Sequence, residues 1–236
     1  MNIVPADRYS FAELAELFTR GYEGYSIPVH IDEASMKYIV DAWSIDLSRS
    51  RVAEDAGICN LGVRGDLGWI GGLGVVPEQR RHGIGRALME SVLDNAPSTV
   101  DLEVIEGNDG AKRLYDDLGF KVTRLLEVWS LPEQPEIEAR LVDPSPLGQR
   151  DLPWQRADEA LPADYDRWEV DGGAMLLKGG NVLQLQAADI DAATALLSRG
   201  KALSYVNVPE GDVASAALAA LGGTMSLRQF EMRLVR

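Results

Sequence analysis

Apolar side chains recur at three- and four-residue spacing in several stretches of the first half of the chain, which predicts amphipathic helices. The first helix begins after Ser10 and the second after Asp32, and both residue types favour the N-terminal cap of a helix. Two more helices follow Gly83 and Asn108. Apolar runs bounded by turn residues predict strands at 51–54, 57–64, 68–76, 100–105 and 120–131. This alternation indicates an α/β fold with a mixed sheet.

The last hundred residues repeat the same order of elements. Two strands in 168–187, joined at 178–181, are followed by a helix at 190–197, a strand at 202–208, a helix at 212–221 and a strand at 225–235. The stretch 132–136 contains two prolines and two acidic residues and reads as a linker. We therefore predict two domains, residues 1–132 and residues 137–236.

The stretch 68–95, read as strand, loop and helix, carries the strongest chemical signal. Gly83 and Gly85 leave backbone N–H groups unobstructed at the start of a helix, where a phosphate is favoured. Arg80, Arg81 and Arg86 add charge-assisted hydrogen bonds to phosphate oxygens. No Lys-Ser or Lys-Thr pair follows, and position 88 is leucine, so neither a P-loop nor a G-x-G-x-x-G fingerprint is present. The loop is predicted to bind a pyrophosphate.

Two segments resemble a known family. Residues 75–85 are similar to the V-x-P…R-x-x-G-x-G element of the GNAT superfamily of acyl-CoA-dependent N-acyltransferases. The next element of that family is resembled by Leu102, Glu103, Val104, Asn108, Ala111, Leu114, Tyr115, Gly119 and Phe120. The resemblance implies the GNAT fold for the first domain and acetyl-CoA as the co-substrate.

The resemblance also implies where the cofactor binds. In the family the basic loop holds the CoA pyrophosphate, and the pantetheine runs along the preceding strand, hydrogen-bonded to its main chain. The implied cofactor-binding residues are Leu73, Val75, Arg80, Arg81, His82, Gly83, Ile84, Gly85, Arg86 and Asn108. Simple core packing is an alternative role for the side chains of Leu73 and Val75, and helix capping is one for Asn108.

Two catalytic residues are implied at positions where the family places them. An alkyl amine is mostly protonated at neutral pH, since its pKa is ~10.4, so a base must remove a proton before attack. Glu103 is the candidate base. Its alternative role is that of a strand carboxylate that only pairs with a basic side chain at the surface. Tyr115 is the candidate acid for the departing thiolate, and the alternative is a tyrosine that only packs on its helix.

The segment between the first two helices lies over the acceptor pocket in the resembled family. Here it contains Tyr22, Tyr25 and His30, which we expect to contact the acceptor. The alternative is aromatic packing of a loop onto the core with a histidine at the surface.

The second half lacks the R-x-x-G-x-G loop. Its equivalent turn carries Asp189 and Asp191, whose charges would repel a pyrophosphate. We therefore predict that residues 137–236 form a second, smaller, degenerate GNAT-like domain that does not bind CoA.

Composition narrows the choice of partners. The formal net charge of −14 argues against nucleic acid. No apolar run approaches the ~20 residues that span a bilayer, and the N-terminus lacks a secretory pattern, so a cytoplasmic protein without membrane contact is expected. The single cysteine excludes an internal disulfide, and two histidines exclude a histidine-rich metal site, so no metal is expected. A monomer and a homodimer both stay open.

The leading functional hypothesis is an N-acetyltransferase that moves an acetyl group from acetyl-CoA to a primary amine of a small molecule or a peptide. Two alternatives stay open. One is transfer of a longer acyl group, and the other is a CoA-binding sensor or interaction module without catalysis. Retention of both Glu103 and Tyr115 argues against the non-catalytic alternative.

Overall fold

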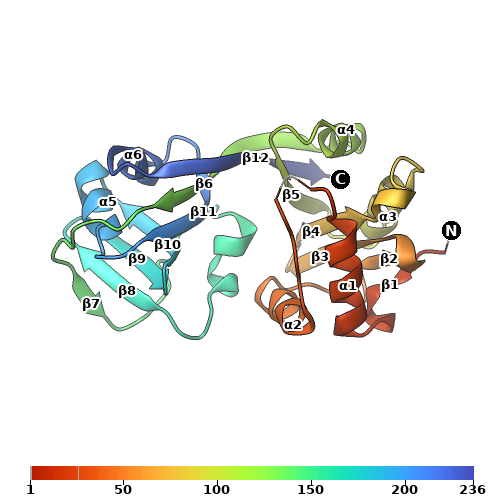
Figure 1. Cartoon of the computed structure of the whole chain (residues 1–236), viewed down its shortest axis with the longest axis horizontal. Coiled ribbons are helices and arrows are strands. Elements are labelled where there is room, and N and C mark those ends of the chain that lie inside the picture. The colour runs from red at the N-terminus through yellow and green to blue at the C-terminus, as the bar shows by residue number, and fades with distance from the viewer. Residues whose placement is uncertain (1, 26) are drawn as a thin grey trace. The chain divides into compact units, whose positions relative to one another are not determined.

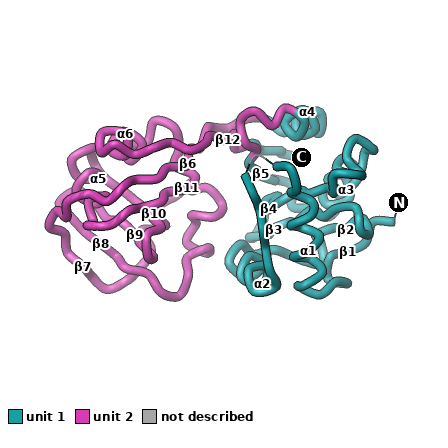
Figure 2. The backbone as a smooth tube through the Cα atoms, viewed as in Figure 1, with its two compact units in different colours: residues 1–103, 110–121, 232–236 teal, residues 104–109, 122–231 magenta. Residues whose placement is uncertain are grey.

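The computed structural model describes residues 2–25 and 27–236 and separates into two compact units (Figure 2). The units interleave along the chain, whereas the division expected from the sequence has one boundary at 132–137. The first unit contains the residues up to Glu103 together with Gly110–Lys121 and Met232–Arg236, and the second contains Val104–Asp109 and Val122–Glu231.

The first unit is built on a mixed sheet in the order β1-β2-β3-β4-β5. Neighbouring strands are antiparallel except β4 and β5, which are parallel. The strands are β1 (Val4–Pro5), β2 (Arg51–Ala53), β3 (Gly57–Arg64), β4 (Leu67–Val75) and β5 (Thr99–Ile105). Short 3-10 helices occur at Ala6–Arg8, Glu54–Ala56 and Pro77–Gln79.

The helices of the first half begin where the sequence predicts them (Figure 1). They are α1 (Phe11–Gly21), α2 (Glu33–Ala42), α3 (Ile84–Leu93) and α4 (Asp109–Asp117). Ser10 and Glu13 form the complete capping box of α1, and the Asp32 side chain caps α2. Gly119, with φ 96°, provides the left-handed residue that follows α4.

Helices α1 and α3 pack on opposite faces of the sheet. On one face, a Cβ added at Gly74 would meet the backbone of Gly21 in α1 at 3.2 Å. On the other face, a Cβ added at Gly85 of α3 would lie 3.8 Å from Leu73 and from Val75. Because successive strand residues point to opposite faces, β4 is covered on both sides.

A bulge and a separation of strands shape the centre of this sheet. Asn60 pairs with Gly72 and Leu61 with Ile70, so Gly71 is an extra residue in β4. The parallel pairing of β4 with β5 ends at Ile70 and Leu102, although both strands continue. Beyond the bulge the two strands therefore diverge.

In the second unit the strands are ordered β12-β6-β11-β10-β9-β8-β7. Its strands are β6 (Lys121–Leu131), β7 (Arg140–Val142), β8 (Asp166–Val170), β9 (Gly173–Lys178), β10 (Asn181–Ala187), β11 (Leu203–Pro209) and β12 (Thr224–Val235). The helices are α5 (Ile190–Leu197) and α6 (Val213–Ala220), with 3-10 turns at Trp154–Arg156 and Asp158–Ala160. Residues 168–187 form parts of three strands rather than the expected two, because Asp171 and Gly172 make a further turn with Gly172 at φ 79°.

The order of elements from β10 to β12 repeats the order from β4 to β6, and β10 and β11 are parallel as β4 and β5 are. The predicted α/β architecture with mixed strand pairing is confirmed. The pairing of β6 with β12 explains why the two units alternate along the chain. Within the second unit β6 lies beside β12, and the last residues of β12 belong to the first unit.

Each unit has a separate core. In the first unit, a hydrophobic cluster around α1 and α2 buries the side chains of Leu14, Leu17, Phe18, Met36, Val52, Ile58 and Val76. The second unit buries Trp129, Leu131, Met175, Leu177, Leu185, Leu196, Leu203, Tyr205 and Leu218, among others.

Candidate active site

Helix α3 begins at the loop that the sequence predicts to bind a pyrophosphate. Its N-cap residue is Gly83, in the left-handed region with φ 82°, and no side chain caps the helix. Arg81 is left-handed as well, with φ 65°. The first turn of α3 therefore offers its backbone N–H groups and the positive end of the helix dipole to the loop, which fits a bound phosphate.

Arg80 lies beside this loop, but its guanidinium is bound to main-chain oxygens. Nε donates to the Val75 carbonyl at 2.9 Å, and Nη2 donates to the carbonyls of Gly21, at 3.2 Å, and Glu23. These bonds connect the end of β4 to the end of α1. They make Arg80 a positioning residue of the loop.

The other basic side chains of the loop have different surroundings. Arg86 reaches from α3 to α4, where Nη2 lies 2.8 Å from Asp117, and Nη1 lies 3.7 Å from Glu90. Arg81 and His82 are exposed. Among the predicted phosphate-binding side chains, Arg81 and His82 are thus the ones that project from the loop into solvent.

A pair of substitutions separates these roles. Arg80→Ala should lower the free energy of unfolding by about 1–2 kcal/mol, because it removes charge-assisted hydrogen bonds to three carbonyls. Arg81→Ala should leave the unfolding free energy within about 0.5 kcal/mol and weaken acetyl-CoA binding several-fold. Denaturant melts and calorimetry on both variants test this, and equal loss of stability in both would contradict the assignment.

Leu73 and Val75 lie on the part of β4 beyond its pairing with β5. Their side chains face Gly85 in α3, and Ile84, 6% exposed, anchors the first turn of that helix. Core packing and pantetheine binding are therefore compatible roles. The side chains of Leu73 and Val75 pack, while their main chain lies where β4 and β5 separate.

Three tyrosines predicted for the site lie together in the first unit. Tyr22 stacks on Phe18 at 4.7 Å, and the edge of Tyr25 meets Tyr22 at 5.2 Å. Tyr115 in α4 is buried, 6% exposed. Burial and the neighbouring Tyr22, Cys59 and Tyr25 raise the pKa of Tyr115 well above its usual value. The Tyr115 phenol therefore keeps its proton and can donate it.

The hydroxyl of Tyr22 reaches the bulge in β4. A Cβ on Gly72 would lie 3.1 Å from it, so only glycine leaves this space open. The backbone of Leu73 donates a hydrogen bond to the Tyr22 oxygen, and burial raises the Tyr22 pKa despite that bond. At the bulge, a main-chain N–H of β4 is thus hydrogen-bonded to a neutral phenol.

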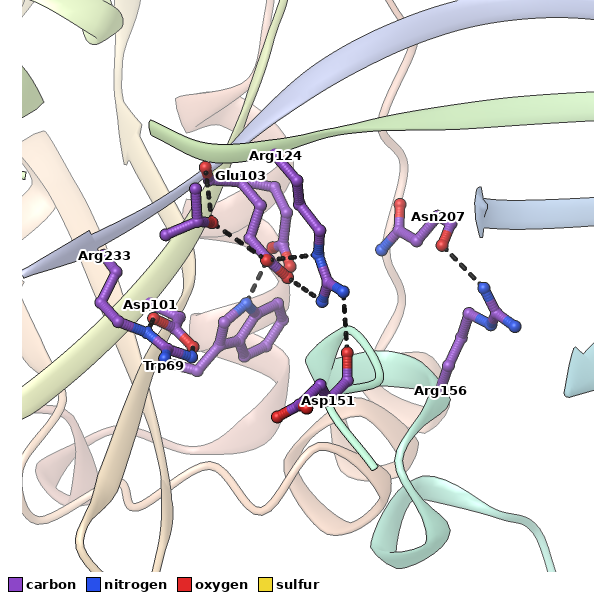
Figure 3. Close-up of polar contacts among 10 residues, drawn as sticks. Trp69, Asp101, Glu103, Arg124, Asp151, Arg156, Asn207 and Arg233 are labelled. Carbon is purple, nitrogen blue, oxygen red and sulfur yellow. Dashed lines mark hydrogen bonds and ion pairs between the residues drawn. The ribbon is translucent and has the colours of Figure 1, made fainter. Parts of the chain in front are cut away.

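Glu103 is held by a tryptophan that the sequence analysis did not single out. Trp69 Nε1 donates to Glu103 Oε2 at 2.8 Å (Figure 3), and the Trp69 ring meets Trp43 edge-on at 5.6 Å. Trp69 is 2% exposed. The alternation of β4 could have indicated that Trp69 faces the same side as Glu103, but the contact joins residues 34 positions apart.

The strand that carries Glu103 is also held by the end of the chain. Arg233 forms a bidentate pair with Asp101, with N···O distances of 2.6 and 2.7 Å (Figure 3). The backbone N–H of Arg236 donates to the Ser98 carbonyl at 2.8 Å. No sequence signal links these residues.

Asn108 and His30 are placed less distinctly. Asn108 immediately precedes α4 and its backbone N–H donates to the Ile105 carbonyl at 3.0 Å. His30 is exposed, and its electrostatic neighbour is Asp32 at the start of α2. The structure does not bring His30 into the tyrosine cluster.

The corresponding helix terminus of the second unit is closed. Asp189 is the N-cap of α5, and its side chain accepts a hydrogen bond from Ala192 N at 2.9 Å. A carboxylate thus occupies the position that a phosphate would take at α3.

The divergence of β10 and β11 in the second unit is filled by residues 147–158 of the same unit. The Arg156 guanidinium donates to the Leu183 carbonyl on β10 at 3.4 Å and to the Asn207 carbonyl on β11 at 2.9 Å (Figure 3). Gln184 Nε2 in turn donates to the Arg156 carbonyl at 2.8 Å. The main chain of β10 and β11 is therefore engaged by this segment where the two strands diverge.

Within residues 2–25 and 27–236, no group of three or more His, Cys, Asp or Glu side chains could hold a metal ion. None of the described helices is long and apolar enough to cross a membrane.

Comparisons with known proteins agree with this geometry. Residues 13–120 match the acetyltransferase (GNAT) family. A search of curated proteins finds no match. Among solved structures, a protein from Pyrococcus horikoshii assigned as an acetyltransferase superposes with a TM-score of 0.72 at 18% identity, covering 100% of this chain and 89% of that one.

Two further structures are similar along their whole length. A GCN5-related N-acetyltransferase from Sphaerobacter thermophilus has a TM-score of 0.65 at 18% identity, with 98% and 93% of the two chains covered. A tandem GNAT protein from the clavulanic acid biosynthesis pathway has a TM-score of 0.63 at 14% identity, with 99% and 98% covered. These likenesses extend the fold over both units. Residues 13–120 therefore match the GNAT family of acetyltransferases, and the whole chain shares the fold of these solved structures.

Proposed function

We propose that the protein transfers an acetyl group from acetyl-CoA to a primary amine by direct attack in a ternary complex. The observation that carries the proposal is the uncapped N terminus of α3, led by Gly83, directly after a bulged β4 that has separated from β5. This arrangement provides donors for a pyrophosphate and a main-chain edge for a pantetheine arm within one strand–loop–helix unit.

The residues of the first unit then divide the work of binding. The N–H groups from Gly83 to Arg86 and the exposed side chains of Arg81 and His82 bind the pyrophosphate, and Arg80 fixes the loop. The main chain at Leu73 and Val75 binds the pantetheine. Holding both reactants at attack distance supplies several kcal/mol of the rate acceleration.

Two side chains handle the protons. The Glu103 carboxylate accepts the proton that the acceptor ammonium must lose, and Trp69 fixes its orientation. The Tyr115 phenol, kept neutral by burial, gives its proton to the departing thiolate. Tyr22 and Tyr25 line the acceptor side, with the exposed His30 at its rim.

The second domain, residues 137–236, binds no CoA in this proposal. Its helix terminus is capped by Asp189, and the space between its central parallel strands is filled by the segment that carries Arg156. One cofactor per chain is expected. A buried, lone Cys59 suits the reducing cytoplasm, where we place the enzyme.

Titration calorimetry with acetyl-CoA tests the site. Wild type should bind one equivalent, and Gly83→Asp should abolish binding because a carboxylate then occupies the N terminus of α3. Gly211→Asp is the matched control: Gly211 precedes α6 and has φ 79°, close to the 82° of Gly83, and a Cβ at either position meets nothing within 4 Å. Both variants therefore carry the same backbone strain.

The outcomes separate the alternatives. Binding lost in Gly83→Asp and kept in Gly211→Asp supports the proposal, and release of thiol with a panel of amines then identifies acceptors. Two equivalents per chain would reject the inactive second domain. Tight binding without amine-dependent thiol release would favour a CoA sensor.

A further inference from the structure

A buried polar side chain in the first unit has no evident structural use. Asn60 in β3 is 1% exposed, and neither Nδ2 nor Oδ1 has a hydrogen-bond partner among the residues that the structure describes. Buried amides are nearly always hydrogen-bonded, because leaving them unsatisfied destabilises the fold. The position therefore calls for a polar group supplied from outside the chain.

Its place in the sheet shows where that group would lie. Asn60 is the cross-strand partner of Gly72, next to the bulge in β4, so both residues point to the same face. On this face a Cβ on Gly72 would come within 2.7 Å of the Phe18 ring and 3.1 Å of the Tyr22 hydroxyl. Asn60 thus faces the side of the bulge that Phe18 and Tyr22 cover.

Other polar groups of the candidate site gather on the same face. The Tyr22 oxygen accepts the hydrogen bond from the Leu73 backbone. Next to it, a Cβ on Gly71 would lie 2.6 Å from the Trp69 ring, and Trp69 in turn holds Glu103. The bulge is therefore flanked by the Asn60 amide and the Tyr22 hydroxyl on one side and by the Trp69–Glu103 pair on the other.

We propose that Asn60 is a positioning residue that holds a water molecule at the bulge for deprotonation of the acceptor. The inference rests on the proposed acetyl transfer to an amine. Oδ1 and Nδ2 provide one acceptor and two donors for the water. The acceptor ammonium loses one N–H bond to the water, the water passes a proton to the Glu103 carboxylate, and the neutral amine attacks.

Asn60→Leu is the decisive variant, because leucine has a similar size and needs no hydrogen bond. Its melting temperature should be no lower than that of wild type, since an unsatisfied amide is removed from the core. Acetyl-CoA affinity should change less than about twofold, since the cofactor is bound elsewhere. At neutral pH, kcat should fall about 100-fold, the contribution typical of assisted proton transfer.

The pH profile distinguishes this role from a packing role. Without the relay, the reaction depends on amine that is already neutral, whose fraction rises about tenfold per pH unit below its pKa of ~10.4. The deficit of Asn60→Leu should therefore shrink steadily as the pH rises toward 9.5. Asn60→Ser, which can still hold a water, should restore much of the neutral-pH rate and serves as well if the leucine variant does not fold.

Cys59→Val is the matched control. Cys59 is the neighbouring fully buried residue of β3, and its sulfur contacts Met89 of α3 on the opposite face. Its profile should match wild type. Wild-type turnover and pH dependence in both Asn60 variants would overturn the inference, whereas absence of amine-dependent thiol release by the wild type itself would instead reject the proposed function.

Discussion

Tyr115→Phe is expected to lower turnover by about 100-fold or more while acetyl-CoA affinity changes less than about twofold. The side chain is buried in α4 and its ring packs against Phe120 at 6.0 Å, so phenylalanine can keep that packing. Only the hydroxyl is lost, and with it the proton for the thiolate. Steady-state kinetics and calorimetry on the same preparation measure the two quantities.

The pH dependence adds a second check on Tyr115. Because burial raises its pKa well above the usual value, the phenol is protonated throughout the range in which the protein is assayed. Ionisation of Tyr115 should therefore cause no loss of wild-type activity below pH 10, and the pH profile of Tyr115→Phe should have the same shape in this range. Such a loss would mean that Tyr115 ionises during assay.

Tyr38→Phe serves as the control for removal of a tyrosine hydroxyl, since Tyr38 is 56% exposed on α2. It should match wild type in turnover and affinity. Unchanged turnover in Tyr115→Phe would reject the acid role and leave Tyr115 as a packing residue.

Removal of Met232–Arg236 is expected to abolish acetyl-CoA binding, although these residues lie far from the loop in sequence. They belong to the first unit, where Met232 is fully buried and Arg233 pairs with Asp101 on the strand that also carries Glu103. Without them β5 loses the last part of β12, one of its two neighbours in the sheet. Calorimetry together with thermal melting tests this.

The single substitution Arg233→Ala should act in the same direction but more weakly. It leaves the Asp101 carboxylate, 8% exposed, without its bidentate partner. Loss of a fully buried partner costs ~3–5 kcal/mol, and because Arg233 is 46% exposed we expect a decrease in unfolding free energy of about 2 kcal/mol.

Arg228→Ala is the control, since Arg228 pairs with the exposed Glu106 and Glu210 in the second unit. Arg228→Ala should lower the free energy of unfolding clearly less than Arg233→Ala does. A truncated protein that binds acetyl-CoA normally would show that the chain end is dispensable for the site.

Local sequence determined most of the elements and the chemistry of the phosphate loop. The caps at Ser10 and Asp32, the start of α3 at Gly83 and the left-handed Gly119 are decided by residues within a few positions of one another. The repeated order of elements in the second half can also be predicted from the sequence. The same holds for the acidic turn, in which Asp189 caps α5. The short strands β1 and β7 and the Asp171–Gly172 turn were not predicted, and the flanks of that turn continue the same apolar run.

Tertiary structure decided what those residues contact. Local sequence predicts a phosphate as the partner of Arg80, yet its guanidinium donates to carbonyls of α1 and β4. Nothing in the local sequence reveals that those carbonyls lie close together. Local sequence also does not single out Asn60 or Trp69, because the role of each depends on a residue of a neighbouring strand.

The division into units shows the same limit on a larger scale. The linker composition at 132–136 suggests a break between two repeats, but residues 122–231 belong to one compact unit and β12 ends in the other. Strand pairing is set by burial and hydrogen bonding between distant segments, so no window of sequence contains it. Short-range patterns thus determined the elements and their caps, and long-range packing decided which side chains form the site.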